Sequence, residues 1–289
     1  MVQDAVLASL GYTLMPADIA APFLEDGQLV NLMPQSSSTC LLRTTRPGII
    51  TTQIALRALP RRLLALDCNE TSIKETRAQL SSAGVNDAQV RQCNLYDDAL
   101  TEPGQYDFSY ARMVFQHLSD PLSALRNIHR SLAIGGRLCI CDIDDRWFGA
   151  APQPPELQSF LARVARAQAA RGGDRHVGSK LANYLEETGY SDIRCSMLLV
   201  STSLIGATAF CDLVFGYKME VIPQAELEQA QREMAAIKES IERYPGRQYL
   251  YRSGYRCRSW RGPRCRRGYA DDRRELHHHG KCGNSQYGP

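Results

Sequence analysis

The chain lacks any apolar run approaching the roughly 20 residues that span a bilayer. Its first residues also lack a basic stretch followed by an apolar core, the pattern of a secretory signal. These absences favour a cytoplasmic protein and give no support to a membrane partner. G-x-G-x-x-G is absent as well, and no Tyr is followed four residues later by Lys, so the usual patterns of nicotinamide-dependent reductases are missing.

No C-x-x-C pair occurs among the ten cysteines, which are scattered along the chain. Several fall on expected core strands, namely Cys139, Cys141 and Cys195, where buried free thiols in a reducing compartment are the better interpretation than disulfides. Cysteine and histidine also gather near the end of the chain, at Cys257, Cys265, Cys282 and His277 to His279. Their spacing matches no usual zinc pattern, so we expect no metal site.

Charge is distributed unevenly along the 289 residues. The formal net charge is +3, but residues 252–289 hold ten Lys or Arg against three Asp or Glu, so residues 1–251 carry −4. An acidic body gives no support to a nucleic-acid partner.

We expect three parts: an N-terminal helical cap or leader over 1–39, a main domain over 40–251, and a disordered basic tail over 252–289.

The stretch from Tyr106 to Asp142 reads as a strand, a helix and a second strand. Residues 106–111 and 137–142 are short apolar-rich runs bounded by turn residues, which is typical of strands buried on both faces of a parallel sheet. Asp120 as N-cap and Pro121 as first residue open the helix between them, and Gly135 and Gly136 are expected to close it. Together they predict a right-handed βαβ unit.

Within this stretch, D-F-S-Y-A-R, F-Q-H-L-S-D-P and L-A-I-G-G-R-L stand in the order of the fourth strand, its helix and the fifth strand of a known family. Over roughly residues 40–215 the chain resembles the class I S-adenosylmethionine-dependent methyltransferases, particularly those that modify small molecules. The resemblance implies an α/β fold, doubly wound, with a mostly parallel, seven-stranded-type, Rossmann-like sheet and helices on both faces. It also implies S-adenosylmethionine as cofactor and a small molecule as methyl acceptor.

Two positions suit the first half of the cofactor site. Gly48 begins a helix where the family has its glycine-rich turn, although Leu42 and Thr44 stand where an acid and an earlier glycine are usual. Asp67 ends the apolar run LLALD, 19 residues after Gly48. At this spacing a nucleotide-binding βαβ unit places an acid on the ribose hydroxyls, and a carboxylate can accept both. A surface Asp at a strand end is the alternative for Asp67.

Two further pairs follow later strands. After a third strand, over 88–92, the resemblance places Asn94 at the adenine amino group and Leu95 against the ring, although a mere turn residue would also fit at Asn94. Ala111 and Arg112 lie at the carboxyl end of the fourth strand, where open α/β sheets bind ligands. Their backbone groups would line the methionine part of the cofactor.

His117, which follows the fourth strand, is the candidate catalytic residue. Histidine titrates near neutral pH, so it could remove a proton from the acceptor; bracing the loop by a hydrogen bond is the other interpretation. The loop DIDDRWFGAAPQPP comes after the fifth strand. Trp147 and Phe148 there could form an apolar pocket wall, and its three acids could simply be solvated.

The later part of the chain predicts a helix over 156–170, a second helix over 180–188 and a strand over 193–201. The segment GGDRHVG, over 172–178, introduces the second helix. Residues 223–243 then form a polar amphipathic helix. It would cover the cleft, pair with a second subunit in a homodimer or, most commonly for such a helix, face solvent.

The function that the resemblance favours is methyl transfer from S-adenosylmethionine to a small molecule by direct in-line displacement. Proximity and orientation carry such a reaction, so the absence of a Ser-His-Asp or Cys-His arrangement is expected. Two alternatives remain: a methyltransferase-like binding protein without activity, favoured by the altered glycine turn, and an NAD(P)-dependent reductase. The sequence does not identify the acceptor atom.

Overall fold

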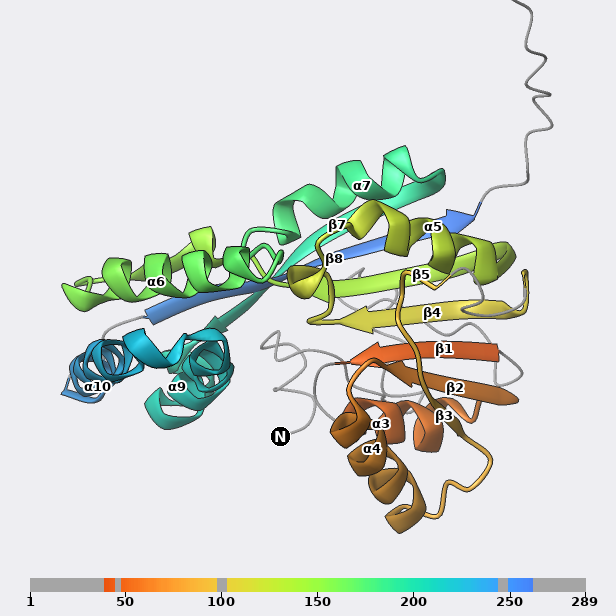
Figure 1. Ribbon diagram of the computed structural model, residues 1–289, viewed down its shortest axis with the longest axis horizontal. Helices are drawn as coiled ribbons and strands as arrows, with labels where there is room; N and C mark the ends of the chain where they lie inside the picture. Colours follow the sequence, from red (N-terminus) through yellow and green to blue (C-terminus); the bar gives the residue numbers. More distant parts are fainter. Residues whose placement is uncertain (1–38, 45–47, 98–102, 244–248, 262–289) are drawn as a thin grey trace, which may run out of the picture.

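The computed structural model describes residues 39–44, 48–97, 103–243 and 249–261. The expected N-terminal cap lies outside these residues except for Thr39. One mixed sheet runs through the described part in the order β3-β2-β1-β4-β5-β8-β6, with β7 also paired to β8 (Figure 1). The strands are β1 (Thr39–Thr44), β2 (Arg62–Asp67), β3 (Gln89–Gln92), β4 (Tyr106–Arg112), β5 (Leu132–Asp142), β6 (Phe148–Ala150), β7 (Tyr190–Ser201) and β8 (Tyr249–Arg261).

The first five strands are parallel and form the cofactor-type half of the fold. β1 pairs in parallel with β2 on one side and with β4 on the other, so the chain winds outward in both directions from β1. β2 continues to β3 and β4 continues to β5, again in parallel. The prediction of a doubly wound, mostly parallel α/β fold is therefore confirmed.

The strand count differs from the seven that the resemblance implies, since the sheet has eight strands in the part of the chain that is described. β6 has only three residues and pairs with β8 beyond the point where β5 leaves it. The turn η2 (Asp145–Trp147) interrupts the line between them. β6 is thus a short separate strand that follows β5 along the same edge of β8.

β8 corrects the expected boundary at residue 252. Residues 252–261 are the greater part of this strand, which pairs antiparallel with β5 on one side and with β7 on the other. Pairing on both edges supplies backbone hydrogen bonds that the Arg-rich composition does not reveal. The remainder of the expected tail, residues 262–289, lies outside the described residues.

The helices cover both faces of the sheet and also form a separate group beside it. They are α3 (Ile49–Ala58), α4 (Glu70–Ser82), α5 (Pro121–Ser131), α6 (Glu156–Ala170), α7 (Leu181–Glu187), α8 (Thr202–Ile205), α9 (Ala207–Phe215) and α10 (Leu227–Arg243). Short 3-10 turns join them: η1 (Phe115–His117), η3 (Gly178–Lys180), η4 (Gly216–Val221) and η5 (Gln224–Glu226). None of these helices is both long enough and apolar enough to cross a bilayer.

α5 begins as the sequence predicts but ends earlier. The Asp120 side chain accepts a hydrogen bond from the Ser123 amide at 2.9 Å, and Pro121 is the first helical residue. The expected closure at Gly135 and Gly136 is wrong, because the helix ends at Ser131 and the extended Leu132 opens β5. Leu132 is fully buried opposite Tyr106, so tertiary packing ends the helix before the glycines.

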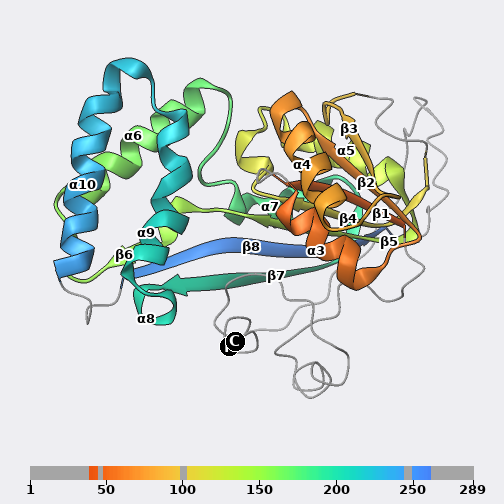
Figure 2. The ribbon, with the colours of Figure 1, turned by 90° about the horizontal axis from the view of Figure 1, so that it is seen from below.

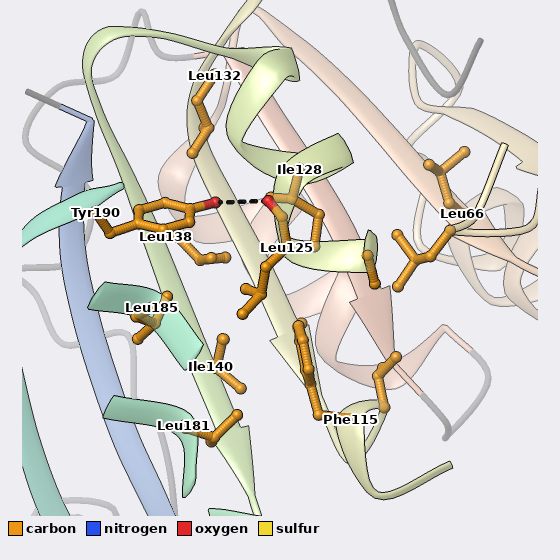
Figure 3. Packing of buried hydrophobic residues seen from close by; sticks show 14 of the residues in the cluster. Leu66, Phe115, Leu125, Ile128, Leu132, Leu138, Ile140, Leu181, Leu185 and Tyr190 are labelled. Atoms are coloured by element: carbon orange, nitrogen blue, oxygen red, sulfur yellow. Dashed lines mark hydrogen bonds between the residues drawn. The ribbon is translucent and has the colours of Figure 1, made fainter. Parts of the chain in front are cut away.

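The first core lies between the parallel strands and the helices α5 and α7 (Figure 3). Tyr190 closes one end of it and donates a hydrogen bond from its hydroxyl to the Leu125 carbonyl oxygen at 3.4 Å. On the opposite face, a third core packs α3 and α4 against alternate residues of the same strands, including Cys139 and Cys141. Those two thiols are buried as predicted, whereas Cys195 is exposed, contrary to expectation.

A second core forms the helical lobe, which consists of α6, α9, α10 and η4 beyond one end of the parallel strands (Figure 2). Phe148 joins it and packs with Phe210 and Phe215 at ring distances of 6.1 and 5.8 Å. α10 buries Ile237 and Ile241 in this core, so the expectation of a solvent-facing helix is wrong. Its apolar stripe is matched by α6, a partner that sequence periodicity does not identify.

Candidate active site

The candidate site lies at the carboxyl ends of the parallel strands. β1 has β2 on one side and β4 on the other, which makes this the point where the winding direction of the sheet reverses. Open α/β sheets bind ligands in the crevice at such a switch point. Asp67 ends β2, Asn94 follows β3 and Arg112 ends β4, so the structure brings these predicted residues to one edge (Figure 1).

Gly48 has a packing role that the sequence did not reveal. It precedes α3 with φ +72°, in the left-handed region, and accepts the Thr52 amide hydrogen bond at 2.7 Å. A Cβ at this position would lie 2.9 Å from both the Thr76 Cα and the Gln79 Cβ of α4. A side chain cannot fit in that space. Glycine is therefore required for the close approach of α3 to α4, whatever it does for a ligand.

Asp67 ends β2 in a half-buried position. Its Oδ1 accepts the Asn69 amide at 2.8 Å, and its carbonyl oxygen accepts the Cys93 amide at 2.9 Å. Asn69 in turn caps α4, accepting from the amides of Thr71 and Ser72. This series of hydrogen bonds fixes the carboxylate at the tip of the strand.

Asn94 and Leu95 occupy a turn after β3. The Asn94 Oδ1 accepts the Tyr96 amide at 3.1 Å, and its own amide donates to Asp97 Oδ2 at 3.2 Å. The predicted adenine acceptor is thus engaged locally. Leu95 is fully buried in the first core, so its side chain anchors the turn, and the Leu95 carbonyl oxygen accepts from Asn127 Nδ2 at 2.8 Å.

Ala111 and Arg112 continue β4 to its carboxyl end. Ala111 is 1% exposed within the first core, and Arg112 is half-buried. Met113 then takes φ +56°, unusual for a residue with a side chain, and its amide donates to the Cys141 carbonyl oxygen at 2.8 Å. The chain therefore turns sharply out of the sheet beside the switch point.

His117, an exposed residue, lies on η1. Its Nδ1 lies 3.1 Å from Nε2 of Gln168, a buried residue of α6. Partial burial lowers the pKa of His117 from 6.5 to about 4, with further lowering by the Arg175 and Arg171 cations. The imidazole is therefore neutral at pH 7. A residue of the helical lobe holds the predicted catalytic residue of the sheet half.

Comparison with known proteins identifies the domain. Residues 45–140 match the family model described as methyltransferase domain. This part of the chain, about a third of its length, is similar to methyltransferase domains. Over 88 residues it is also 36% identical to methyltransferase str2 of Strobilurus tenacellus, a match that covers 29% of this chain. The chain covers 31% of that relative's length, less than a third.

Solved structures show the same class I methyltransferase fold. A putative methyltransferase from Bacillus halodurans superposes with a TM-score of 0.54 at 16% identity, covering 85% of this chain and 100% of that one. The phosphoethanolamine N-methyltransferase 2 of Haemonchus contortus, in complex with S-adenosyl-L-methionine, gives 0.53 at 13% identity, covering 85% of this chain and 53% of that one. At these identities the likeness establishes the fold of the domain.

Two residues that the sequence did not single out lie close to His117 in the structure. Gln168 reaches His117 from α6, and its Oε1 is buried without a hydrogen-bond partner in the described residues. Gly173 passes close by, where a Cβ would lie 2.3 Å from the Gln116 carbonyl oxygen and 2.4 Å from Gln168 Nε2. The GGDRHVG segment is visible in the sequence, but the close approach of Gly173 to Gln168 beside His117 appears only in three dimensions.

Asp142 fixes the position of η1 from the end of β5. Its Oδ2 accepts the Phe115 amide at 2.7 Å and the Gln116 amide at 3.4 Å, and its Oδ1 accepts the Ile143 amide at 2.9 Å. Burial raises the pKa of Asp142 to about 6, and these amides together with Arg175 limit the rise. The expectation of solvated acids in this loop is wrong for Asp142, Asp144 and Asp145, all of them buried.

Asp145 joins the loop to the helical lobe through a buried charge network. Its Oδ2 lies 2.8 Å from Arg175 Nε and its Oδ1 lies 2.6 Å from Lys218 Nζ. Arg175 also donates to Gln116 Oε1 at 2.5 Å, and both cations lie over the Tyr217 ring. Burial alone would raise the pKa of Asp145, but Lys218 and Arg175 overcome that effect and hold it well below its usual range.

Trp147 and Phe148, expected to form one apolar pocket wall, lie in different surroundings in the structure. Phe148 belongs to the second core, while Trp147 is 40% exposed and contributes no side chain to that core. Within the described residues, no group of three or more His, Cys, Asp or Glu side chains could hold a metal ion. The His and Cys side chains considered for zinc lie outside the part of the chain whose side chains are described.

Proposed function

We propose that this protein transfers the methyl group of S-adenosylmethionine to a small-molecule acceptor. The observation that carries the proposal is the arrangement of Asp67, Asn94 and Arg112 at the switch point of a methyltransferase domain. S-adenosylmethionine is the cofactor expected of this fold, since relatives are crystallised with it or with S-adenosylhomocysteine. When bound, it supplies an activated methyl group on a sulfonium sulfur.

The residues at the edge suit parts of that cofactor. Asp67 is fixed at the tip of β2, and its carboxylate can accept hydrogen bonds from ribose hydroxyls. The Asn94 turn would lie beside the adenine, and the backbone at Gly48, Ala111 and Arg112 would flank the remainder. Leu95 would act from within the core, by holding the Asn94 turn in place.

The acceptor would enter between η1 and the helical lobe. The contact between His117 and Gln168 joins these two parts, and His117 is an exposed residue. With the Gln168 Oε1 against Nδ1–H, reached by rotating the amide half a turn, Nε2 becomes an acceptor for a proton of the substrate. His117 would then assist by removing that proton, while cofactor and acceptor are held in line.

Titration calorimetry of the intact protein with S-adenosylmethionine tests this function. We expect binding, weakened by the departures at Leu42 and Thr44, and a loss of about tenfold to a hundredfold in affinity for Asp67→Ala, since a hydrogen bond to a charged group contributes roughly 1.5 to 3 kcal/mol. Asp87→Ala is the matched control, an exposed carboxylate before the amino end of β3. Equal affinity of both variants would remove Asp67 from the site.

Two alternatives give different results in the same experiment. An inactive methyltransferase-like protein, favoured by the altered glycine turn, would either fail to bind at millimolar S-adenosylmethionine or bind it without transferring a labelled methyl group to any small molecule offered. A reductase would bind NADPH instead. Transfer of radiolabelled methyl to oxygen, nitrogen or carbon acceptors then identifies the atom that is modified.

A further inference from the structure

Two cysteines lie next to the predicted adenosine contacts. Cys68 directly follows Asp67 at the end of β2, and Cys93 directly precedes Asn94 after β3. Cys68 is exposed and Cys93 is half-buried, and neither takes part in a disulfide. They are 25 positions apart in sequence, so no C-x-x-C pattern marks them.

The register of the sheet makes them neighbours. Asp67 of β2 pairs with Gln92 of β3 in parallel, and this is the last recorded pair of the two strands. Continuing the same register by one residue places Cys68 opposite Cys93. Two hydrogen bonds hold the strand ends together: the Cys93 amide donates to the Asp67 carbonyl oxygen at 2.9 Å, and Gln92 Nε2 donates to the Cys68 carbonyl oxygen at 2.9 Å. Adjacent strands lie roughly 5 Å apart, within the range of about 4.4 to 6.8 Å that Cα atoms span in a disulfide.

Both thiols also belong to the same face of the sheet. Leu64 and Leu66 pack in the first core, and side chains alternate along a strand, so Cys68 falls on their side. Cys93 packs against that same core, whereas Val90, three residues earlier, packs on the opposite face. Facing positions, bonded backbones and a shared face are the conditions that a disulfide between neighbouring strands needs.

We propose that Cys68 and Cys93 form a reversible disulfide that weakens cofactor binding. A low-molecular-weight disulfide such as oxidised glutathione is the oxidant. The Cys68 thiolate attacks one of its sulfurs and releases one glutathione thiolate; the Cys93 thiolate then attacks the Cys68 sulfur and releases the second. The two protein thiols lose two electrons and two protons, and these reduce the oxidised glutathione to two molecules of reduced glutathione.

The effect on binding follows from the contacts of the Cys93 thiol, and it depends on the proposed function. Cys93 Sγ lies 3.4 Å from the Asn94 carbonyl oxygen and 3.8 Å from Asp97 Oδ2, and Asp97 holds the Asn94 amide. Rotation of Sγ towards Cys68 breaks both contacts. The turn that carries Asn94 is then released while the backbone after Asp67 is pulled towards β3, so both adenosine contacts shift.

The test oxidises the full chain with oxidised glutathione and maps its peptides without reduction. We expect one linked pair that contains Cys68 and Cys93, absent from C68S and from C93S and retained in C195S, which removes another exposed thiol. Hydrogen exchange over residues 93–97 should rise on oxidation and return on reduction. Recovery of Cys68 and Cys93 only as separate glutathione adducts would overturn the proposal.

Calorimetry on the same samples measures the consequence. Affinity for S-adenosylmethionine should fall at least about tenfold on oxidation of the wild-type protein and of C195S, recover with a phosphine reductant, and stay unchanged in C68S. A linked pair with unaltered affinity would refute the regulatory effect. Absence of binding by the reduced protein would instead refute the proposed function. Peptide mapping and hydrogen exchange would still show whether the Cys68–Cys93 disulfide forms.

Discussion

His117 shows how the folded surroundings change the chemistry expected from a residue type. The sequence offers a histidine that titrates near neutral pH, but partial burial in the folded protein, together with the Arg175 and Arg171 cations, lowers its pKa to about 4. Such an imidazole stays unprotonated through the physiological range. It is a weaker base than an exposed histidine, so it would assist a reaction that is driven mostly by orientation.

We expect His117→Ala to lower turnover by about 10² to 10⁴ and to leave affinity for S-adenosylmethionine unchanged. Because protonation removes the base, kcat/KM of the wild-type protein should decline only as pH falls towards about 4, not near 6.5. A pH–rate profile and calorimetry measure the two effects. His176→Ala is the control, a half-buried histidine outside this pair. A parallel loss of stability and affinity in His117→Ala would mean that the residue only braces the loop.

At the scale of elements, α3 and α4 approach each other through Gly48. Gly48 and Gly84 have nearly the same backbone conformation, with φ +72° and +74°, but only Gly48 faces atoms within 4 Å. Alanine substitutions at these two glycines therefore separate two contributions to the loss of stability: the strained backbone conformation and the steric clash with neighbouring atoms. In each case an alanine must adopt a left-handed backbone, which costs about 1 to 2 kcal/mol.

Gly84→Ala should lower the free energy of unfolding by that amount alone. Gly48→Ala should lower it by about 1 to 3 kcal/mol more, because its Cβ would meet α4 at 2.9 Å. Urea denaturation of both variants measures the difference. Equal losses would show that α3 and α4 move apart without cost.

The loop after β5 is held by charge rather than by an apolar surface. Asp145 lies between Arg175 and Lys218, and all three side chains are at most 2% exposed. Asp145→Ala leaves buried cations without their carboxylate and should lower the free energy of unfolding by about 3 to 5 kcal/mol. Denaturant titration checks this value.

The exposed ion pair of Glu228 and Arg232 provides the control for Asp145. Glu228→Gln should change stability by no more than about 0.5 kcal/mol, because solvent screens such pairs. A loss below 1 kcal/mol for Asp145→Ala would show that water enters the network and that the loop does not depend on it.

In the whole molecule, β7 and β8 connect two cores. β8 pairs with β5 beside the first core and with β6 beside the second, and β7 follows it along both (Figure 2). Strands shared by two cores should couple their unfolding. The helical lobe and the sheet half are thus expected to behave as one cooperative unit.

Phe160→Ala tests that coupling from within the helical lobe. Phe160 is fully buried and packs 5.8 Å from the Phe215 ring, so its loss should lower the free energy of unfolding by about 3 to 5 kcal/mol. Hydrogen exchange should accelerate to a similar extent in α5 and in α6. Leu59→Ala, at a side chain 67% exposed, should change little. Acceleration confined to residues 148–243 would show that the lobe unfolds alone.

The sequence by itself determined the elements that local chemistry specifies. The Asp120–Pro121 helix start, the apolar strand that ends in Asp67, and the helix over residues 156–170 each depend on a cap, a run or a period within a few residues. The order of the elements over residues 106–142 also predicted a βαβ unit, whereas the doubly wound sheet was implied by the resemblance to a known family. Such features need no knowledge of distant neighbours.

Tertiary structure alone decided which residues meet. β8 is a strand because two other strands pair with it, α10 is buried because α6 presents a matching face, and Gly48 is required because α4 lies against it. His117 meets Gln168 of α6, and the ends of β2 and β3 lie side by side, only in the folded protein. Burial, register and pKa arise from contacts between distant segments, and a sequence pattern confined to one segment does not contain them.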